Sequence, residues 1–208
     1  MKAETFFTED EKERLRQSVV AAESKTAGEI VPMIVTSAAR YTEIELLGVF
    51  IGLFAGMLVE WFWSDPWGSP YFQLWPVIGA FAGFLIFRFP AVKRMLASKE
   101  RVGEAVHTLA LASFTDQGLH HTRDHTGILI LIALLEHRVE VLADRGINEK
   151  VSHGTWDEIV QSISAGIKSG RACDAYCKAI ERCGDILATH FPRQADDKDE
   201  LSNRLVTK

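Results

Sequence analysis

Two long apolar stretches, separated by a short polar connector, constrain this chain more than any other feature. Residues 44–63 read "IELLGVFIGLFAGMLVEWFW", residues 71–87 read "YFQLWPVIGAFAGFLIF", and "SDPWGSP" joins them. A helix needs about 17–25 mainly apolar residues to cross the hydrocarbon core of a bilayer. The two stretches therefore predict a two-helix transmembrane hairpin over residues 44–89.

The residues at the ends of the two stretches support this prediction. Glu45 and Glu60 lie at the ends of the first stretch, where a carboxylate reaches water easily. Aromatic residues gather around the connector, as they do at the depth of lipid headgroups: Trp61, Trp63, Trp67, Tyr71 and Trp75. The alternative, two buried helices of a water-soluble core, would bury these aromatic residues beside a polar connector. The sequence therefore favours the lipid bilayer as a partner.

Glycines recur at every fourth position within both stretches. Gly48, Gly52 and Gly56 lie in the first stretch, and Gly79 and Gly83 lie in the second. Such spacing allows the backbones of two membrane helices to approach closely, although glycine is also simply common in membrane helices. If the spacing is used, packing of the hairpin on itself is favoured over dimerisation.

The distribution of charge predicts the orientation of the hairpin. The connector carries no basic residue, whereas basic residues flank the two stretches on their other side: Arg40, Arg88, Lys93, Arg94, Lys99 and Arg101. Positive charge stays on the cytoplasmic side, so both soluble parts are expected to face the cytoplasm. Three closely spaced cysteines, an odd number, fit a reducing compartment. The formal net charge of −5 and the lack of a long basic stripe exclude nucleic acid as an expected partner.

The soluble parts predict an α/β domain in which helices cover a sheet. Residues 1–43 form its first part, residues 90–192 its second part, and the polar residues 193–208 a disordered tail. The first part contains a helix over 8–27, which Thr8 and Glu11 begin as a capping box, and a strand over 29–35. Pro32 suggests that this strand is an edge strand or has a bulge.

The second part opens with a helix from Ser98 to Phe114 and continues with a β-hairpin. Nine apolar residues at 127–135 are too few to span a bilayer but suit a strand that is buried on both faces. Residues 138–143 alternate, as in a strand with one wetter face. Two more helices follow, over 155–168 and from Cys173 to about His190.

These segments together resemble the TPM domain family. The resemblance is carried by "EIVPMIV", "TGILILIALLEHRVEVLADRGI" and "W..IV..I..GIKSG", and covers residues 8–35 and 98–191. It is closest to a bacterial, membrane-attached branch in which an apolar hairpin interrupts the domain after its first strand. The resemblance implies an α/β sandwich and location in the bacterial inner membrane. Members have been linked to photosystem repair, receptor-associated membrane proteins, calcium binding and acid phosphatase activity.

The candidate site residues are carboxylates at one end of the predicted β-hairpin. Asp124 matches the acidic residue that precedes the buried strand in the family, and Asp144 lies in the turn that follows the second strand. In an antiparallel pair these positions reach the same edge of the sheet, where the two carboxylates could share calcium or magnesium. Glu29 is a weaker third candidate. The favoured alternative is that Asp144 is a turn residue and Asp124 a loop or cap residue. A later aspartate of the family pattern is replaced by Val151-Ser152-His153.

The remaining polar groups favour structural roles. His120, His121 and His125 have no zinc-site spacing and predict a solvated loop. Cys173, Cys177 and Cys183 are expected to be buried and inert, and Trp156 to be a packing residue.

Two functions follow from the sequence, and the first is favoured. It is a membrane-anchored interaction or assembly module, with a membrane-protein partner and without enzymatic activity. The second is a phosphatase-like enzyme that depends on a divalent metal at the loop carboxylates. The nucleotide-binding and hydrolase motifs GxGxxG, GxSxG and HExxH are absent from the sequence.

Overall fold

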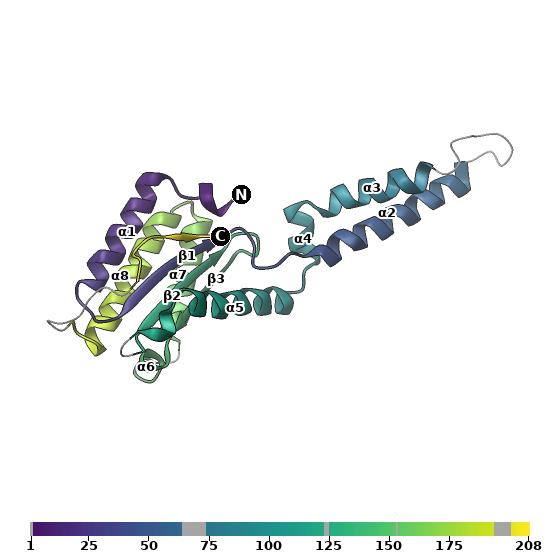
Figure 1. The fold of residues 1–208 in the computed structure, drawn as a ribbon. Coiled ribbons are helices and arrows are strands. Elements are labelled where there is room, and N and C mark those ends of the chain that lie inside the picture. Colours follow the sequence, from purple (N-terminus) through teal and green to yellow (C-terminus); the bar gives the residue numbers. More distant parts are fainter. Residues whose placement is uncertain (1, 64–73, 123–124, 153, 194–200) are drawn as a thin grey trace. The chain divides into compact units, whose positions relative to one another are not determined.

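A computed structural model describes residues 2–63, 74–122, 125–152, 154–193 and 201–208 of the chain. The chain divides into two compact units (Figure 1). The first unit combines Met1–Ala38 with Gly103–Lys208, and the second is Ala39–Val102. The second unit is thus inserted into the sequence of the first, and it contains the apolar stretches.

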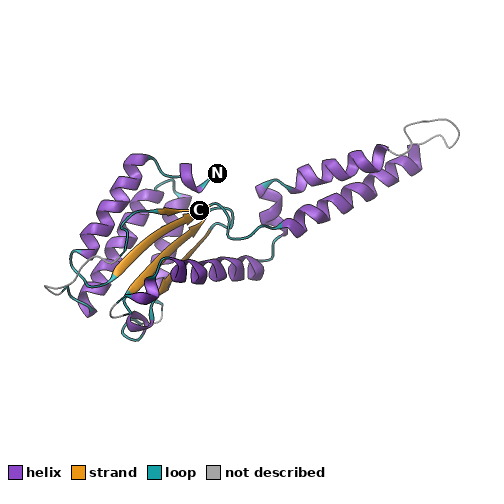
Figure 2. Ribbon diagram, in the orientation of Figure 1, coloured by secondary structure: helices purple, strands orange, loops and turns teal. Residues whose placement is uncertain are grey.

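A four-stranded mixed sheet organises the first unit (Figure 2). Its strands are β1 (Glu29–Val35), β2 (Gly127–Ala133), β3 (Arg138–Ala143) and β4 (Val206–Thr207), in the order β3-β2-β1-β4. β1 runs parallel to β2, whereas β2 and β3 form an antiparallel hairpin. The predicted strand at 29–35 and the predicted hairpin are therefore confirmed.

Helices cover both faces of this sheet, as the sequence predicts. One face packs against α1 (Glu9–Glu23), α7 (Thr155–Lys168) and α8 (Ala172–His190). The other face packs against α5 (Lys99–Asp116). Three short helices complete the unit: η1 (Ala3–Thr5), η2 (Leu119–His121) and α6 (Arg145–Asn148). The Thr8–Glu11 capping box begins α1 as predicted.

The buried strands alternate between the two faces. In β2, isoleucines at 128, 130 and 132 face the three-helix layer, and leucines at 129 and 131 face α5. All seven residues of β1 and of β2 are buried. The apolar run at 127–135 is therefore explained by burial on both faces, because neither face of β2 meets water.

The structure corrects two predictions beside β1. The prediction of an edge strand or a bulge at residues 29–35 is wrong, because β1 lies between β2 and β4 and pairs with β2 in unbroken register over all seven residues. Pro32 is tolerated in this inner strand because β4 pairs with β1 only at Met33 and Ile34, so its missing N–H has no strand partner to lose. The prediction of a disordered tail is wrong for Val206–Thr207, because Lys208 accepts from the Thr36 N–H (2.9 Å) and donates to the Ile34 carbonyl (3.1 Å). Residues 194–200 of that tail lie outside the described residues.

The second unit is a pair of helices followed by a short third one. α2 (Thr42–Trp63) and α3 (Leu74–Phe87) pack side by side in antiparallel directions, and α4 (Pro90–Leu96) follows (Figure 1). Glycines form the contact between α2 and α3. A Cβ added at Gly52 would lie 2.0 Å from the Gly79 carbonyl oxygen, and one at Gly83 would lie 2.0 Å from the Gly48 carbonyl oxygen. The glycine spacing therefore serves packing of the two helices on each other, as the sequence predicts.

Candidate functional site

The carboxylates predicted from sequence belong to the end of the sheet where β1 and β2 begin and β3 ends. Glu29 opens β1 and lies opposite Gly127, the first residue of β2. Asp144 follows β3 and donates its N–H to the Gly127 carbonyl at 2.9 Å. Asp124 lies outside the described residues, so its prediction is not tested by the structure.

Asp144 is held in place by its role as the N-cap of α6. Its Oδ1 accepts from the Arg145 N–H at 2.6 Å, which satisfies one of the donors that a helix start leaves open. Its Oδ2 lies 3.3 Å from Nδ1 of His125, two residues before the start of β2. The Asp144 side chain is 15% exposed. The Asp144 carboxylate therefore caps α6 and also contacts His125 at the open end of the β2–β3 hairpin.

His125 adopts a backbone conformation that brings it to Asp144. Its φ is 54°, in the left-handed region that few residues other than glycine adopt. Its N–H donates to the Thr122 carbonyl at 3.1 Å, which closes the loop before β2. The pairing of His125 with Asp144 was not predicted from the sequence, because it depends on this turn.

Glu29 is separated from Asp144 by the width of β2. Two strand spacings, about 10 Å, separate the backbones of β1 and β3. Leu119 packs onto the intervening Gly127, where an added Cβ would lie 2.7 Å from the Leu119 carbonyl oxygen. Glu29 is buried, at 5% exposure, whereas Asp144 borders the surface. Among the described residues, no group of three histidine, cysteine, aspartate or glutamate side chains is placed to hold a metal ion.

The other histidines of the loop lie on η2. The ring centroids of His120 and His121 lie 3.8 Å apart, and the two ring planes are tilted by 43°. Across the same end of the sheet, Trp156 packs at the rim of the core and donates its Nε1–H to Asn148 at 3.1 Å. Asn148 in turn donates to the Ala143 carbonyl at 2.6 Å, which fixes α6 to the end of β3.

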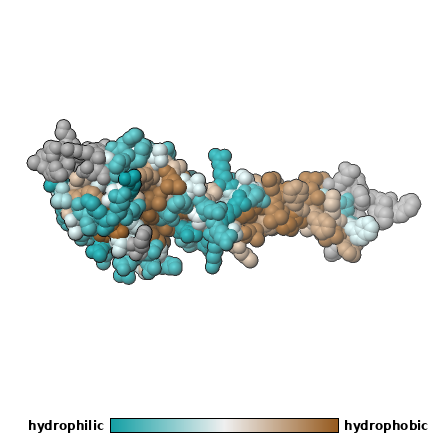
Figure 3. All heavy atoms as spheres, turned by 90° about the horizontal axis from the view of Figure 1, so that it is seen from below, coloured by the Kyte–Doolittle hydropathy of each residue, from teal (hydrophilic) through white to brown (hydrophobic). Residues whose placement is uncertain are grey.

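The second candidate site is the outer surface of the α2–α3 pair. Large apolar side chains point away from the glycine contact, and Phe54 and Phe81 are 62% and 64% exposed. Figure 3 shows an apolar surface along these helices. α2 is long and apolar enough, over Thr42–Phe62, to cross a membrane. α3 passes the same test only together with α4, from which it is bent by 83°.

The described part of α3 is shorter than the sequence predicts. It has 14 residues and begins at Leu74, whereas the predicted second membrane helix begins at residue 71. Fourteen helical residues rise about 21 Å, less than the roughly 30 Å of a hydrocarbon core. The connector and residues 71–73 lie outside the described residues. Among the described residues, one helix is thus long and apolar enough to cross a membrane, and the predicted second one is not by itself.

The comparisons with known proteins bear on the first unit. Residues 93–186 match the family model of the TPM domain. This match covers a little under half of the chain and shows similarity to the TPM domain over these residues. The matched range includes β2, β3 and α7, and it leaves out α1 and β1, which the inserted second unit separates from the rest in sequence.

A solved structure shares the fold. The NMR structure of the BA42 protein of the psychrophilic bacterium Bizionia argentinensis is similar, with a TM-score of 0.63 and 21% identity. The alignment covers 100% of this chain and 99% of that one. At this identity the similarity shows a common fold only. A search of curated proteins found no match.

The cysteines of the TPM domain are buried and free, as the sequence predicts. Burial raises the pKa of Cys173 and of Cys183 to about 12. Very little thiolate therefore forms at neutral pH, and the thiolate is the reactive species. Burial on α8 makes all three cysteines packing groups of the core.

A buried tyrosine of the TPM domain escaped the sequence analysis. The Tyr176 hydroxyl accepts from the Met33 N–H of β1 at 2.9 Å and donates to the Ile130 carbonyl of β2 at 2.7 Å. Met33 lies opposite Leu131, so this N–H and carbonyl are neighbouring groups of the parallel ladder. Burial raises the pKa of the hydroxyl far above its usual range. The tyrosine therefore joins α8 to the two central strands.

Proposed function

We propose that the chain is a membrane-anchored interaction or assembly module. In this proposal α2 and α3 insert into a bacterial cytoplasmic membrane as a hairpin. The α/β unit stays at the cytoplasmic surface and presents its TPM domain to a membrane-protein partner, without catalysis of its own. The observation that carries the proposal is the apolar surface of the glycine-packed helix pair.

The helix pair places its large apolar residues and its small residues in the opposite way to a helix pair of a water-soluble protein. In water, two helices bury their large apolar side chains between them, because removal of apolar area from water drives the packing. Here glycine backbones fill the interface, and Phe50, Phe54 and Phe81 are on the outside. Lipid removes the hydrophobic penalty for such side chains and leaves close backbone packing as the force between helices.

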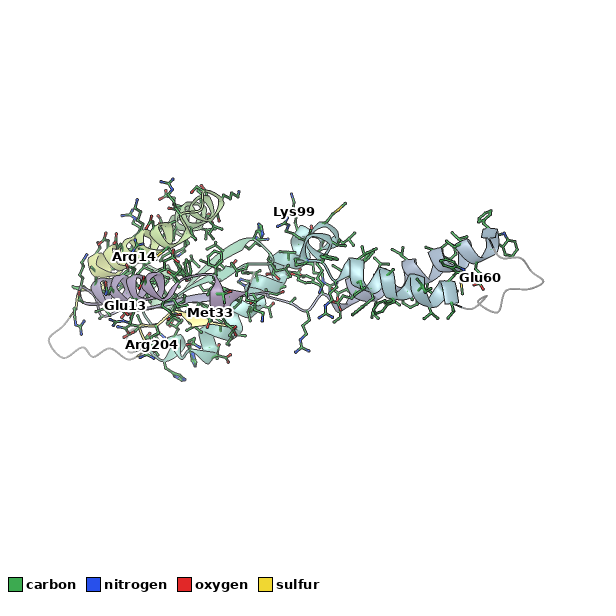
Figure 4. All side chains as sticks on the ribbon, turned by 90° about the horizontal axis from the view of Figure 1, so that it is seen from above. Glu13, Arg14, Met33, Glu60, Lys99 and Arg204 are labelled. Atoms are coloured by element: carbon green, nitrogen blue, oxygen red, sulfur yellow. The ribbon has the colours of Figure 1, made fainter. Side chains whose placement is uncertain are left out.

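The polar groups of the helix pair collect at its ends, which also supports insertion. At one end, Glu43 pairs with Arg101 at 2.7 Å and Glu45 pairs with Lys93. Glu60 and Lys99 mark opposite ends of the unit (Figure 4). Between them, residues 46–59 of α2 contain no charged side chain. A charge inside a bilayer costs several kcal/mol, so this distribution suits a spanning helix.

The absence of catalysis in the proposal is supported by the geometry around Asp144. Its carboxylate already caps α6 and contacts His125. Glu29 is buried on β1, across β2 from Asp144. Asp144 and Glu29, two of the three carboxylates predicted to hold a metal ion, therefore lie in separate surroundings.

Topology mapping by cysteine labelling tests the anchor. The three native cysteines are buried, so a single introduced cysteine is the reactive one. We expect Ser69→Cys in the connector to react with a membrane-impermeant maleimide only from the outer side of sealed cells. Lys178→Cys, in the same chain, reacts only after the cytoplasm is opened. Extraction of the full-length chain by alkaline carbonate, or labelling of Ser69→Cys from the cytoplasmic side alone, would overturn the proposal.

A divalent-metal site at Asp144 is the second candidate, and the observation that favours it is the His125–Asp144 pair beside residue 124. Calcium or magnesium at a hundredfold excess over its Kd would raise the stability of the full chain by about 2.7 kcal/mol. Asp144→Asn keeps the helix cap, because asparagine caps as well as aspartate, but removes the charge. We expect thermal unfolding in detergent to separate the cases. A metal-dependent shift that disappears in Asp144→Asn supports the site, and an unshifted wild type removes it.

A further inference from the structure

The segment after α3 turns sharply at a proline. Pro90 cannot donate the backbone hydrogen bond that would continue α3, and it holds Phe89 in an extended conformation (φ −64°, ψ 134°). α4 therefore begins in a new direction, at 83° to the axis of α3. The bend is a consequence of the sequence and places seven helical residues almost perpendicular to the helix pair.

α4 and its cap have large apolar side chains without protein cover. Met95 is 86% exposed and Phe89 is 63% exposed. Leu96 is also exposed, and α4 contains no buried residue. A seven-residue helix with no fully buried residue gains little packing energy from the rest of its unit, so its exposed apolar side chains point to a further surface.

The same segment is strongly basic. Around α4 and the adjoining end of α2 there are six basic residues against three acidic ones. The basic residues are Arg40, Arg88, Lys93, Arg94, Lys99 and Arg101, and the acidic ones are Glu43, Glu45 and Glu100. The Lys93–Glu45 and Arg101–Glu43 pairs hold two of the basic groups at the start of α2. Arg88 lies over the Phe84 ring, with its guanidinium carbon 5.8 Å from the ring centroid.

The direction of α4 matches a position in the plane of a membrane. Membrane helices tilt by about 20° on average from the bilayer normal. If α3 does so, its 83° bend brings α4 within about 30° of the bilayer plane. A helix in that position exposes one side to acyl chains and the other to headgroups, which is the arrangement of interfacial amphipathic helices.

We propose that α4 docks on the anionic lipid headgroups of the leaflet from which the helix pair enters. Phe89, Met95 and Leu96 contact the acyl boundary, and Arg88 and Arg94 lie near lipid phosphates. This inference rests on the proposed membrane anchor and adds a lipid class to it. The excess of positive charge distinguishes an anionic leaflet from a neutral one, because basic residues gain only where the surface potential is negative.

Fluorescence from single labelled cysteines tests the proposal on the full-length chain. The variants Phe54→Cys, Met95→Cys and Val20→Cys report on α2, α4 and the α/β unit. Each carries an environment-sensitive fluorophore after reconstitution into vesicles of phosphatidylcholine, alone or mixed with phosphatidylglycerol. Brominated acyl chains quench probes in the bilayer, and iodide quenches probes in water.

The three positions separate failure of the inference from failure of the anchor. We expect lipid quenching of the Phe54 probe in both vesicles, of the Met95 probe only with phosphatidylglycerol, and of the Val20 probe in neither. A Met95 probe that stays open to iodide beside a lipid-quenched Phe54 probe overturns the inference and leaves the anchor. A Phe54 probe in water overturns both. A Met95 probe shielded equally in both vesicles, and more so at higher protein density, indicates a second protein copy and overturns the inference.

Charge removal provides a matched control. In the Met95→Cys background, Arg88→Gln together with Arg94→Gln should lower the ratio of docked to undocked α4 by about 5-fold for each arginine. Arg171→Gln together with Arg182→Gln removes the same charge from α8 and should leave that ratio unchanged. Equal effects of the two double variants would show that net charge alone, and not α4, governs docking.

Discussion

The two units of this protein place their large apolar residues in opposite ways. In the α/β unit, isoleucines and leucines of β2 lie inside and are fully covered by helices. In the helix pair, glycines lie inside and phenylalanines lie outside. Both units are rich in apolar residues, so composition alone does not distinguish them.

The difference supports the proposal that water surrounds the α/β unit and lipid surrounds the helix pair. Burial of one large apolar side chain contributes about 1.5–3 kcal/mol when the alternative is water. Buried apolar side chains contribute this free energy throughout the sheet of the α/β unit. The exposed apolar side chains on the outer surface of the helix pair do not contribute it. In an apolar surrounding such as lipid, the exposed phenylalanines of the helix pair carry no hydrophobic penalty. Matched substitutions in the two units can break or sharpen this comparison.

Truncation of a large side chain should have its greatest effect inside the sheet. Ile130→Ala leaves a cavity in the core of β2 and should lower the free energy of unfolding by about 2–5 kcal/mol. Phe54→Ala removes a larger side chain from the outer face of α2 and should leave the stability of the α/β unit unchanged. Hydrogen exchange measured separately on peptides of β2 and α2 reports both effects. Similar losses in the two units would contradict the comparison.

An added side chain should destabilise the glycine contact between α2 and α3 more than it affects the exposed side of α2. In Gly52→Val, the new Cβ meets the Gly79 carbonyl oxygen at 2.0 Å, so the backbones of α2 and α3 must separate. Overpacking of this kind costs about 1–3 kcal/mol. Ala55→Val adds a comparable volume on the exposed side of α2 and is the control. Faster exchange of α3 amides in lipid nanodiscs for Gly52→Val alone is expected, and equal exchange in the two variants would show that the glycine contact is dispensable.

The regular elements could be predicted because each has a local cause. The alternation of β3, the unbroken apolar run of β2 and the Thr8–Glu11 capping box are all determined by neighbours in sequence. The glycine repeat of α2 indicated its packing face for the same reason. In these cases the periodicity of the side chains is enough to decide the structure.

The features that escaped prediction join residues far apart in sequence. Tyr176 bridges β1 and β2 from α8, and Val206–Thr207 add a short strand beside β1. Nothing near a tyrosine or a polar terminus indicates such partners. The candidate site shows the same limit. The position of Asp144 at the sheet end was predictable from the hairpin, but its pairing with His125 depends on a left-handed turn.

The tyrosine bridge offers a smaller test within the α/β unit. Tyr176→Phe keeps the ring in the core but removes the hydroxyl between the Met33 N–H and the Ile130 carbonyl. Loss of one such hydrogen-bonding group should cost about 1 kcal/mol. The amide of Met33 should lose protection from hydrogen exchange more than its neighbours in β1. Uniform loss along β1 would indicate a general loosening of α8 rather than a specific bridge.

Surface charge should contribute least to the stability of the α/β unit, and this contribution is lost in acid. Arg16 and Gln17 donate hydrogen bonds to the Glu13 carboxylate and lower its pKa from 4.5 to about 2. Because the folded-state pKa is the lower one, this stabilisation is complete above about pH 4.5 and is lost as the pH falls towards 2. Glu13→Gln should therefore flatten the fall in melting temperature over that window, by a small amount because the group is fully exposed. Thermal unfolding from pH 5 to pH 2 checks this, with Arg16→Gln expected to act in the same direction. A steeper fall in either variant would mean that Glu13 is less favourably placed in the folded chain than in the unfolded one.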